Sequence, residues 1–138
     1  MPGWLRRVNS ASRLTATPVR VLTVDDQAVF RQIAQDVIAA TDGFEAVGEA
    51  ASGYEALEAV QRLSPDLVLL DVRMPGVDGI EVARRIVTSR SDVAVVLISI
   101  DELADLPSTA ELGGAVPRVR KQDFGPRMLR RLWTEHGG

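Results

Sequence analysis

The sequence contains no cysteine, which excludes disulfide bonds, thiolate metal sites and thiol nucleophiles and fits a reducing compartment. It also lacks a long apolar segment, because the longest run, Val93 to Ile98, is far too short to span a bilayer. The net charge is only -3, so no strong positive field draws the protein to nucleic acid or an anionic membrane. We therefore expect a soluble cytoplasmic protein, with no membrane contact and no direct nucleic-acid binding by this domain alone.

The chain has 138 residues, 46% of them apolar, which is enough for one compact domain. Residues 1–18 contain no acidic side chain and no apolar stretch of secretory length, so they are not a signal peptide. Their Arg-rich and Ser-rich composition leaves an organellar transit peptide as an alternative to a disordered or artificially added tail, which we favour. The domain is placed at residues 19–135, with a frayed C-terminus at 136–138.

From Val19 onward, apolar β-rich runs alternate with amphipathic stretches, a pattern typical of a parallel sheet covered by helices on both faces. Phe30, Ile33, Ala34 and Val37 recur at helical spacing and predict the apolar side of the first helix. Capping pairs, Ser52 with Glu55 and Asp78 with Glu81, predict the starts of the next two helices, whereas Pro107 weakens the helix expected at 103–112. Pro126 suits the first turn of the last helix. The pattern predicts a five-unit α/β fold with strands at 19–24, 44–50, 66–71, 93–99 and 115–120.

Polar residues end or directly follow four of these predicted strands, at the edge where open α/β sheets bind ligands. They supply three carboxylates, one hydroxyl and one ammonium. Converging carboxylates repel one another unless a cation intervenes, and oxygen ligands of this kind suit Mg²⁺. The pattern predicts a divalent metal at this edge, with the candidate residues Asp25, Asp26, Asp71, Ser99 and Lys121.

Asp71 is the candidate nucleophile for phosphoryl transfer, because an aspartate is already ionised near neutral pH and needs no general base. The phosphoryl group then requires a metal, a lysine and a hydroxyl donor to compensate its charge. The only histidine, His136, lies two residues from the C-terminus, so an internal phosphohistidine is not expected. The phosphoryl donor must come from outside the chain.

From about Val19 to Trp133 the chain resembles the receiver domain of bacterial two-component response regulators. The resemblance rests on the Asp25-Asp26 pair after a VLTV strand, the LVLLDVRMPGVDG segment around Asp71, the LIS end of the fourth strand and the lone Lys121. It implies a flavodoxin-like, doubly wound five-stranded parallel sheet of order 2-1-3-4-5 with five helices.

By this resemblance, Asp71 is the phosphoacceptor, while Lys121 and the switch hydroxyl of Ser99 contact the phosphoryl group. Asp25 and Asp26 hold Mg²⁺ together with Asp71 and the backbone carbonyl of Arg73. The resemblance also implies a sensor histidine kinase or phosphotransfer protein as donor, a downstream protein partner and possible homodimerisation. The domain would catalyse only its own phosphoryl transfer and slow dephosphorylation, and would not be a dedicated enzyme.

Each of these residues also has an ordinary explanation when taken alone. Asp25-Asp26 could cap a helix, Pro75, Gly76 and Gly79 suit turns, and an isolated lysine is usually solvated. Their joint occurrence at four strand ends favours a functional site. A flavin-binding protein would need a glycine- and hydroxyl-rich loop instead of two aspartates. A phosphatase of the haloacid dehalogenase type would need a second aspartate where Arg73 stands. The receiver half of a truncated DNA-binding transcriptional regulator remains an alternative.

Four residues depart from the family pattern. Arg118 stands where an aromatic switch residue is usual, Pro117 where glycine is common, and Gln122 where proline often follows the lysine, while Pro107 interrupts the fourth helix. We expect Arg118 to stay at the surface, paired with Glu102, Asp105 or Glu111, because burying an unpaired guanidinium is costly. The alternative is a solvated strand-edge residue with no part in switching. The arginines around Lys121 and in the last helix are expected to form a solvated surface rather than a DNA-binding face.

Overall fold

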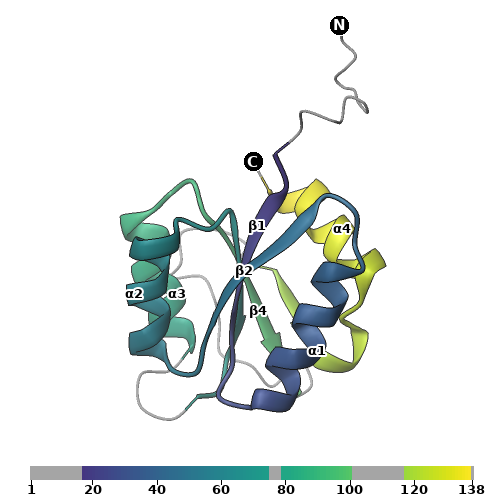
Figure 1. Cartoon of the computed structure of the whole chain (residues 1–138). Helices are drawn as coiled ribbons and strands as arrows, with labels where there is room; N and C mark the ends of the chain where they lie inside the picture. The colour runs from purple at the N-terminus through teal and green to yellow at the C-terminus, as the bar shows by residue number, and fades with distance from the viewer. Residues whose placement is uncertain (1–16, 75–78, 101–116, 138) are drawn as a thin grey trace, which may run out of the picture.

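The computed structural model describes residues 17–74, 79–100 and 117–137 (Figure 1). Five parallel strands form one sheet in the order β2-β1-β3-β4-β5, which confirms the predicted order. The strand bounds are β1 Val19–Val24, β2 Phe44–Ala50, β3 Leu67–Asp71, β4 Ala94–Ser99 and β5 Arg118–Arg120. The third and fourth strands thus begin one residue later than predicted.

Helices cover both faces of the sheet, as the alternating sequence pattern predicts (Figure 1). The sequence predicts five helices, and the described residues contain four α-helices and one 3-10 turn, η5. The helix expected at 103–112 lies outside the described residues, as do Pro107 and Ala115. The buried residues of α2 and α3 form one core cluster with the sheet. The buried residues of α1 and α4 form a second cluster on the opposite face. Their bounds are α1 Ala28–Ala39, α2 Gly53–Leu63, α3 Gly79–Ser89, η5 Lys121–Asp123 and α4 Pro126–His136.

The helix ends agree with several of the sequence signals. Ser52 accepts a hydrogen bond from the Glu55 amide at 3.2 Å, while the Glu55 side chain accepts from the Ala51 amide at 3.0 Å. This is the reciprocal arrangement of a capping box, shifted by one residue on the return bond. Pro126 lies in the first turn of α4, as predicted, and α4 continues through His136. Asp78, Pro75 and Gly76 lie outside the described residues.

One expected core position is wrong in detail. Helix α1 buries Phe30, Ala34 and Ile38, whereas Ile33, expected on the same apolar side, is 46% exposed. The buried residues recur every four positions, so they form one narrow stripe and leave Ile33 at its margin. Trp133 packs against the second core cluster, as expected of a structural aromatic residue.

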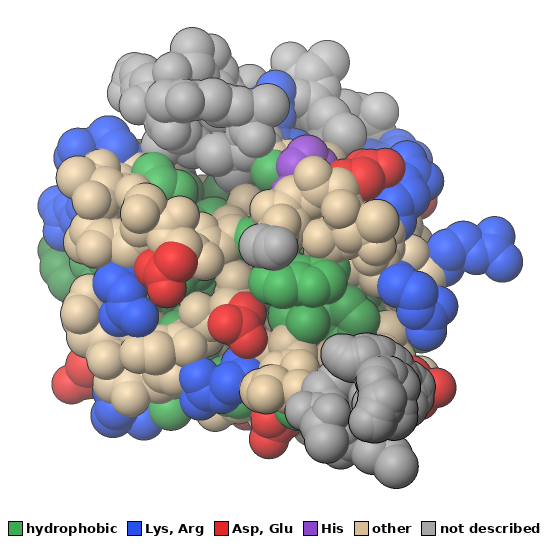
Figure 2. Space-filling model, turned by 90° about the horizontal axis from the view of Figure 1, so that it is seen from above, with side chains coloured by type: hydrophobic (Ala, Val, Ile, Leu, Met, Phe, Trp, Pro, Cys, Tyr) green, Lys and Arg blue, Asp and Glu red, His purple; other side chains and the backbone are tan. Residues whose placement is uncertain are grey.

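The amino end of the sheet, where the strands begin, carries a mixed surface (Figure 2). Side chains of both charges are scattered over it and do not gather in one patch of a single sign. Within the described part of the chain, no helix is both long and apolar enough to cross a membrane.

Candidate functional site

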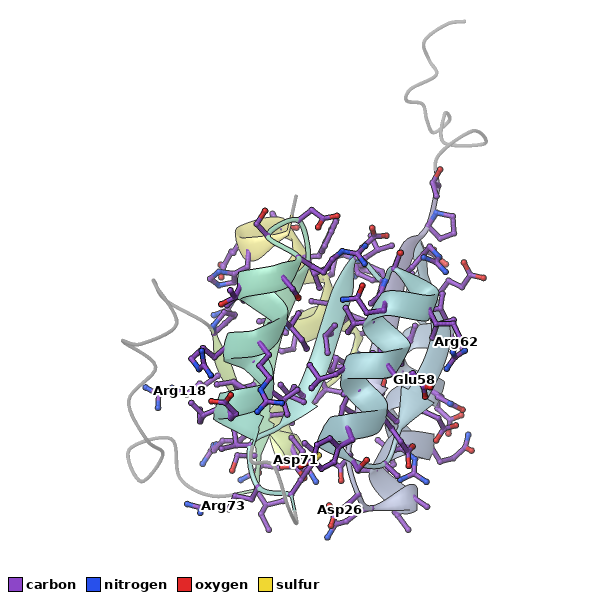
Figure 3. The ribbon with its side chains drawn as sticks, turned by 90° about the vertical axis from the view of Figure 1, so that its left-hand side faces the viewer. Asp26, Glu58, Arg62, Asp71, Arg73 and Arg118 are labelled. Carbon is purple, nitrogen blue, oxygen red and sulfur yellow. The ribbon has the colours of Figure 1, made fainter. Side chains whose placement is uncertain are left out.

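The predicted site residues meet at the carboxyl end of the sheet. Asp26, Asp71 and Arg73 lie at this end of the molecule, Asp71 as the last residue of β3 and the other two in the segments that follow β1 and β3 (Figure 3). They line a cavity of about 130 Å³, together with Gln27, Ser99, Ile100 and Lys121. The residues that the strand-end argument selected therefore meet, because parallel strands bring their carboxyl ends to one edge, and their function there stays a prediction.

Asp25 is the most deeply buried carboxylate of the site, with no exposed surface. Its Oδ1 accepts a hydrogen bond from the Gln27 amide at 2.8 Å, and its carbonyl accepts one from the Arg31 guanidinium at 2.8 Å. Its Oδ2 lies 2.6 Å from Lys121 Nζ but makes no well-directed hydrogen bond to any described residue. Asp25 Oδ2 is thus held by a charge contact and remains available as a metal ligand.

Asp71 ends the fully buried strand β3 and is itself only 6% exposed. Its Oδ1 accepts a hydrogen bond from the Arg73 amide at 3.1 Å. Burial raises the pKa of Asp71 to about 6, with a further rise from the negative charge of Asp25; the Arg73 amide and Lys121 only partly offset it. The ionised carboxylate therefore still predominates at neutral pH.

The start of α3 packs directly against the end of β3. Gly79 donates its amide hydrogen to the Val72 carbonyl at 3.0 Å. A Cβ atom at Gly79 would lie 2.3 Å from the Asp71 carbonyl oxygen, which real side chains do not tolerate. Only glycine allows this close approach, so the residue helps to fix the backbone of Asp71.

Lys121, the only lysine of the chain, reaches into the site from the turn after β5. Its Nζ lies 2.6 Å from Asp25 Oδ2 and 3.6 Å from Asp71 Oδ2, and donates to Gln27 Oε1 at 3.3 Å. The ammonium also lies 4.7 Å from the centre of the Phe30 ring, a distance suited to a cation–π interaction. The side chain is only 10% exposed, so water screens these interactions weakly.

The Lys121–Gln122 peptide is not cis, since the described residues contain no cis peptide bond. Lys121 instead opens the 3-10 turn η5, whose last residue is followed by the buried Phe124. The rings of Phe124 and Phe30 pack at a centroid distance of 6.2 Å. The Lys121 side chain therefore starts from a turn that the Phe30–Phe124 pair anchors, and it passes over the Phe30 ring.

Ser99, the last residue of β4, is 1% exposed and lines the same cavity as Asp71. A buried hydroxyl at the cavity wall can donate to an oxygen atom placed there. All the side chains predicted for this edge are thus brought together.

Three carboxylates of the site are close enough to share one metal ion. Asp25, Asp26 and Asp71 each offer an oxygen atom, and these atoms lie within 4.8 Å of one another. Their donor set consists of hard oxygen ligands, and Asp25 Oδ2 has no hydrogen-bond donor among the described residues, so the residues fit a hard divalent cation such as Mg²⁺. The carbonyl of Arg73, the fourth ligand implied by the resemblance, stays a prediction.

Sequence reasoning missed Gln27 and Phe30 as neighbours of the site. Gln27 follows the Asp25-Asp26 pair directly, so its place beside the acids could have been inferred. Its contact with Lys121, 94 positions away, has no signal in the sequence. Phe30 was assigned to the core, which is correct, but its contact with the ammonium was not predicted.

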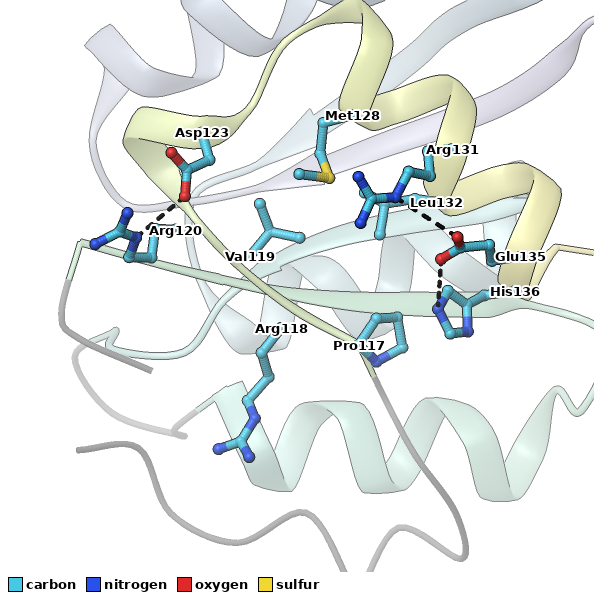
Figure 4. A pocket seen from close by; sticks show the side chains of 10 residues that line it. All are labelled: Pro117, Arg118, Val119, Arg120, Asp123, Met128, Arg131, Leu132, Glu135 and His136. Atoms are coloured by element: carbon cyan, nitrogen blue, oxygen red, sulfur yellow. Dashed lines mark hydrogen bonds and ion pairs between the residues drawn. The ribbon is translucent and has the colours of Figure 1, made fainter. Parts of the chain in front are cut away.

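A second, larger cavity of about 320 Å³ lies between β5 and α4 (Figure 4). Ion pairs join Arg120 to Asp123 at 3.1 Å and Arg131 to Glu135 at 3.5 Å along its wall. Arg118, which is half-buried, points to the other side of β5 from Val119 (Figure 4). Its expected partners, Glu102, Asp105 and Glu111, lie outside the described residues.

A family model described as the response regulator receiver domain matches residues 21–131. Over 106 residues the chain is 42% identical to protein-glutamate methylesterase/protein-glutamine glutaminase 5 of Myxococcus xanthus (strain DK1622), covering 76% of this chain and 30% of that protein. It is 38% identical over 103 residues to response regulator GacA of Pseudomonas viridiflava, covering 75% of this chain and 48% of that protein. The chain spans less than half the length of these relatives.

Solved structures with the same fold cover most of the chain. The signal receiver domain of the putative response regulator NarL from Mycobacterium tuberculosis has a TM-score of 0.75 and 32% identity, covering 86% of this chain and 95% of that one. A chain of the CheX-CheY-BeF3-Mg²⁺ complex from Borrelia burgdorferi has a TM-score of 0.77 and 26% identity, covering 89% and 92%.

Proposed function

The chain belongs to the family of response regulator receiver domains, and from this premise we propose that it accepts a phosphoryl group on Asp71 from an external donor. The observation that carries the proposal is the convergence, around one cavity, of a carboxylate, a lysine and a buried hydroxyl. Each has the chemistry that phosphoryl transfer to an aspartate requires.

The transfer step uses the Asp71 carboxylate as nucleophile. A carboxylate oxygen forms a bond to the donor phosphorus, while the bond from phosphorus to the leaving group breaks and its electron pair stays with that group. With a phosphohistidine donor, the leaving imidazole nitrogen takes a proton from solvent. Lys121 Nζ, 3.6 Å from Asp71 Oδ2, balances the charge of the phosphoryl oxygens, and the Ser99 hydroxyl donates to one of them.

Mg²⁺ is proposed as the cofactor, held by Asp25, Asp26 and Asp71 with the Arg73 carbonyl. When bound, it would neutralise the acidic cluster and compensate charge on the transferring group. The Borrelia neighbour is a complex with BeF3 and Mg²⁺, which supports the assignment by analogy. Asp25 would have to exchange its contact with Lys121 for one with the metal, which would release the ammonium toward Asp71.

The proposed partners are a sensor histidine kinase or phosphotransfer protein upstream and a protein target downstream, with homodimerisation as a possible output. The domain would promote only its own phosphorylation and slow dephosphorylation, in the cytoplasm. Its known relatives include a methylesterase and the regulator GacA, so the comparisons do not favour a DNA-binding effector over another output.

For the output, we propose that Arg118 does not follow Ser99 inward on phosphorylation, because moving a guanidinium into an apolar pocket costs several kcal/mol. The change would then be read through the loops near Ser99 or by dimerisation. NMR shift mapping with and without beryllofluoride should show changes confined to the site loops. A movement of Arg118 from its half-buried position to a fully buried one would contradict this route.

Intact-mass spectrometry tests the proposal most directly. Incubation with acetyl phosphate and Mg²⁺ should add one phosphoryl group to the wild-type protein and none to Asp71→Ala. EDTA should prevent the addition. Equal incorporation in the two proteins, or incorporation that survives EDTA, would show that the site is wrongly assigned.

A further inference from the structure

Gln27 is the polar residue of the cavity that the proposed chemistry leaves without a role. It immediately precedes α1, at the position where Ser, Thr, Asp or Asn commonly accepts a hydrogen bond from the first turn of the helix. Gln27 makes no such side-chain bond. Its side chain extends instead to Lys121, across the carboxyl end of the sheet.

Two bonds from Gln27 act on the two charges that face each other in the site. Its backbone amide donates to Asp25 Oδ1 at 2.8 Å, and its side-chain Oε1 accepts from Lys121 Nζ at 3.3 Å. The first bond orients the Asp25 carboxylate so that Oδ2 faces the ammonium. The second gives the ammonium a neutral acceptor beside two carboxylates.

The Gln27 amide oxygen should respond differently from the carboxylates when a cation binds and Asp71 is phosphorylated. If a cation takes Asp25 and a phosphoryl group is attached to Asp71, both acidic partners of Lys121 change their charge or their contacts. An amide oxygen carries no net charge and binds a hard cation less strongly than a carboxylate. The contact between Gln27 and Lys121 can therefore persist through the whole cycle.

We infer that Gln27 is a positioning residue, whose side-chain oxygen and the Phe30 ring together hold the Lys121 ammonium within reach of Asp71. The inference rests on the proposed function of Asp71 as phosphoacceptor. The Phe30 ring lies 4.7 Å from Nζ, so it limits the ammonium on the side of α1. Gln27 supplies the hydrogen bond that gives the ammonium a direction.

Two substitutions separate this role from a role in the stability of α1. Gln27→Met keeps the length of the side chain and removes the acceptor. Gln27→Asn is shorter by one methylene, so it should not reach Lys121, yet asparagine is among the best residues at this helix position. Gln32→Met is the matched control, because Gln32 is exposed on α1 and bonds only Asp36 among the described residues.

The single lysine gives a direct readout of the contact. Protein labelled with ¹⁵N-lysine has one side-chain nitrogen signal, which reports the surroundings of Lys121 Nζ without any phosphorylation. We expect this signal to move in Gln27→Met and Gln27→Asn and to stay in place in Gln32→Met. Thermal melting should show Gln27→Asn to be at least as stable as the wild type.

The rate of phosphorylation by acetyl phosphate at saturating Mg²⁺ should fall about fivefold in both Gln27 variants, as expected for the loss of one solvent-exposed hydrogen bond of ordinary strength. The Mg²⁺ dissociation constant, measured by NMR titration of the unphosphorylated protein, should change less than about twofold, because the bond from the Gln27 amide to Asp25 is kept. If Gln27→Met does not fold, Gln27→Asn alone decides the result.

Wild-type rates and an unchanged lysine signal in the Gln27 variants would overturn the inference. So would a loss of rate fully explained by weaker Mg²⁺ binding. If the wild-type protein takes up no phosphoryl group, the proposed function fails. In that case the lysine signal still shows whether Gln27 holds Lys121, so the two failures are distinguishable.

Discussion

Asp66 and Asp71 stand at the two ends of strand β3, one just before it and one as its last residue. At the amino end, Asp66 Oδ2 accepts the Arg20 amide hydrogen at 2.9 Å, and the Asp66 amide donates to the Arg20 carbonyl at 2.8 Å. At the carboxyl end, Asp71 faces other carboxylates and its pKa is raised to about 6. Asp66 completes the hydrogen bonding between β1 and the start of β3. The ionised form of Asp71, in contrast, lowers the stability of the folded state.

The two cations at these ends differ in the same way. The Arg20 guanidinium donates to the carbonyls of Leu63 at 2.6 Å and Ser64 at 2.7 Å, where α2 ends with Ser64 in the left-handed conformation. These bonds satisfy carbonyl groups that the end of a helix leaves without partners. Lys121 instead contacts two carboxylates at unequal distances. At the amino end, Arg20 has one set of hydrogen-bond partners. At the carboxyl end, Lys121 can exchange its contact with Asp25 for one with Asp71.

The strongest way to separate the two ends is to remove each aspartate in turn. Asp71→Ala should lose all phosphoryl incorporation from acetyl phosphate, because the nucleophile is gone. Asp66→Ala should keep incorporation but lose about 1 kcal/mol of stability, since it leaves the Arg20 amide without its acceptor. Intact-mass spectra and urea denaturation of both variants measure the two effects. Loss of incorporation in a folded Asp66→Ala protein would contradict the separation.

The raised pKa of Asp71 predicts a pH dependence of stability in metal-free protein. The folded state binds the Asp71 proton up to about pH 6, whereas the unfolded chain releases it near pH 3.8. The contribution of this group to stability is therefore fully present below pH 3.8 and is lost as the pH rises through 6. The difference corresponds to about 3 kcal/mol at neutral pH.

Asp71→Asn removes this titration and should therefore be more stable than the wild type in EDTA at pH 7.5, by up to about 3 kcal/mol. The advantage should shrink as the pH falls and vanish near pH 4. Urea denaturation at several pH values measures it, with Asp66→Asn as the control that should show no such gain. A stability difference independent of pH would show that burial of Asp71 does not strain the site.

Much of the fold could be predicted from the sequence because buried parallel strands leave a clear pattern. All five residues of β3 are buried, and they form a nearly continuous apolar run that ends in Asp71. The alternation of such runs with amphipathic stretches set the order of elements. The exposure of Ile33 could not be predicted, because the limits of a helix's buried stripe depend on the neighbours it packs against.

The convergence of the candidate residues could be predicted from the sequence, but their contacts could not. Topology brings strand ends to one edge, so a residue type at each strand end was enough to place Asp25, Asp71 and Ser99. Which carboxylate Lys121 contacts more closely depends on a long side chain and on the Phe30 ring beneath it. Such choices are set by packing between segments distant in sequence, and no local pattern records them.

At the amino end, Arg20→Met should lower the free energy of unfolding by about 1–2 kcal/mol. Methionine keeps most of the apolar stem but donates no hydrogen bond to the end of α2. The loss should be the same with and without Mg²⁺, because Arg20 lies at the opposite end of the sheet from the acidic cluster. Urea denaturation in EDTA and in millimolar Mg²⁺ measures it. A metal-dependent loss would show that the two ends are coupled.

A small effect is expected in the response of the melting temperature to Mg²⁺. A cation that binds only the folded state stabilises it by about 1.4 kcal/mol at ten times its dissociation constant, or about 4 °C for a domain of this size. Asp26→Asn removes one proposed ligand together with part of the repulsion that raises the pKa of Asp71. The variant should therefore melt slightly higher than the wild type in EDTA but gain less from Mg²⁺. Asp36→Asn, an exposed acid on α1 outside the acidic cluster, is the control and should keep the full gain. A full Mg²⁺ response in Asp26→Asn would place the metal elsewhere. There would then be no reason to expect Lys121 to exchange its carboxylate partners at the carboxyl end of the sheet.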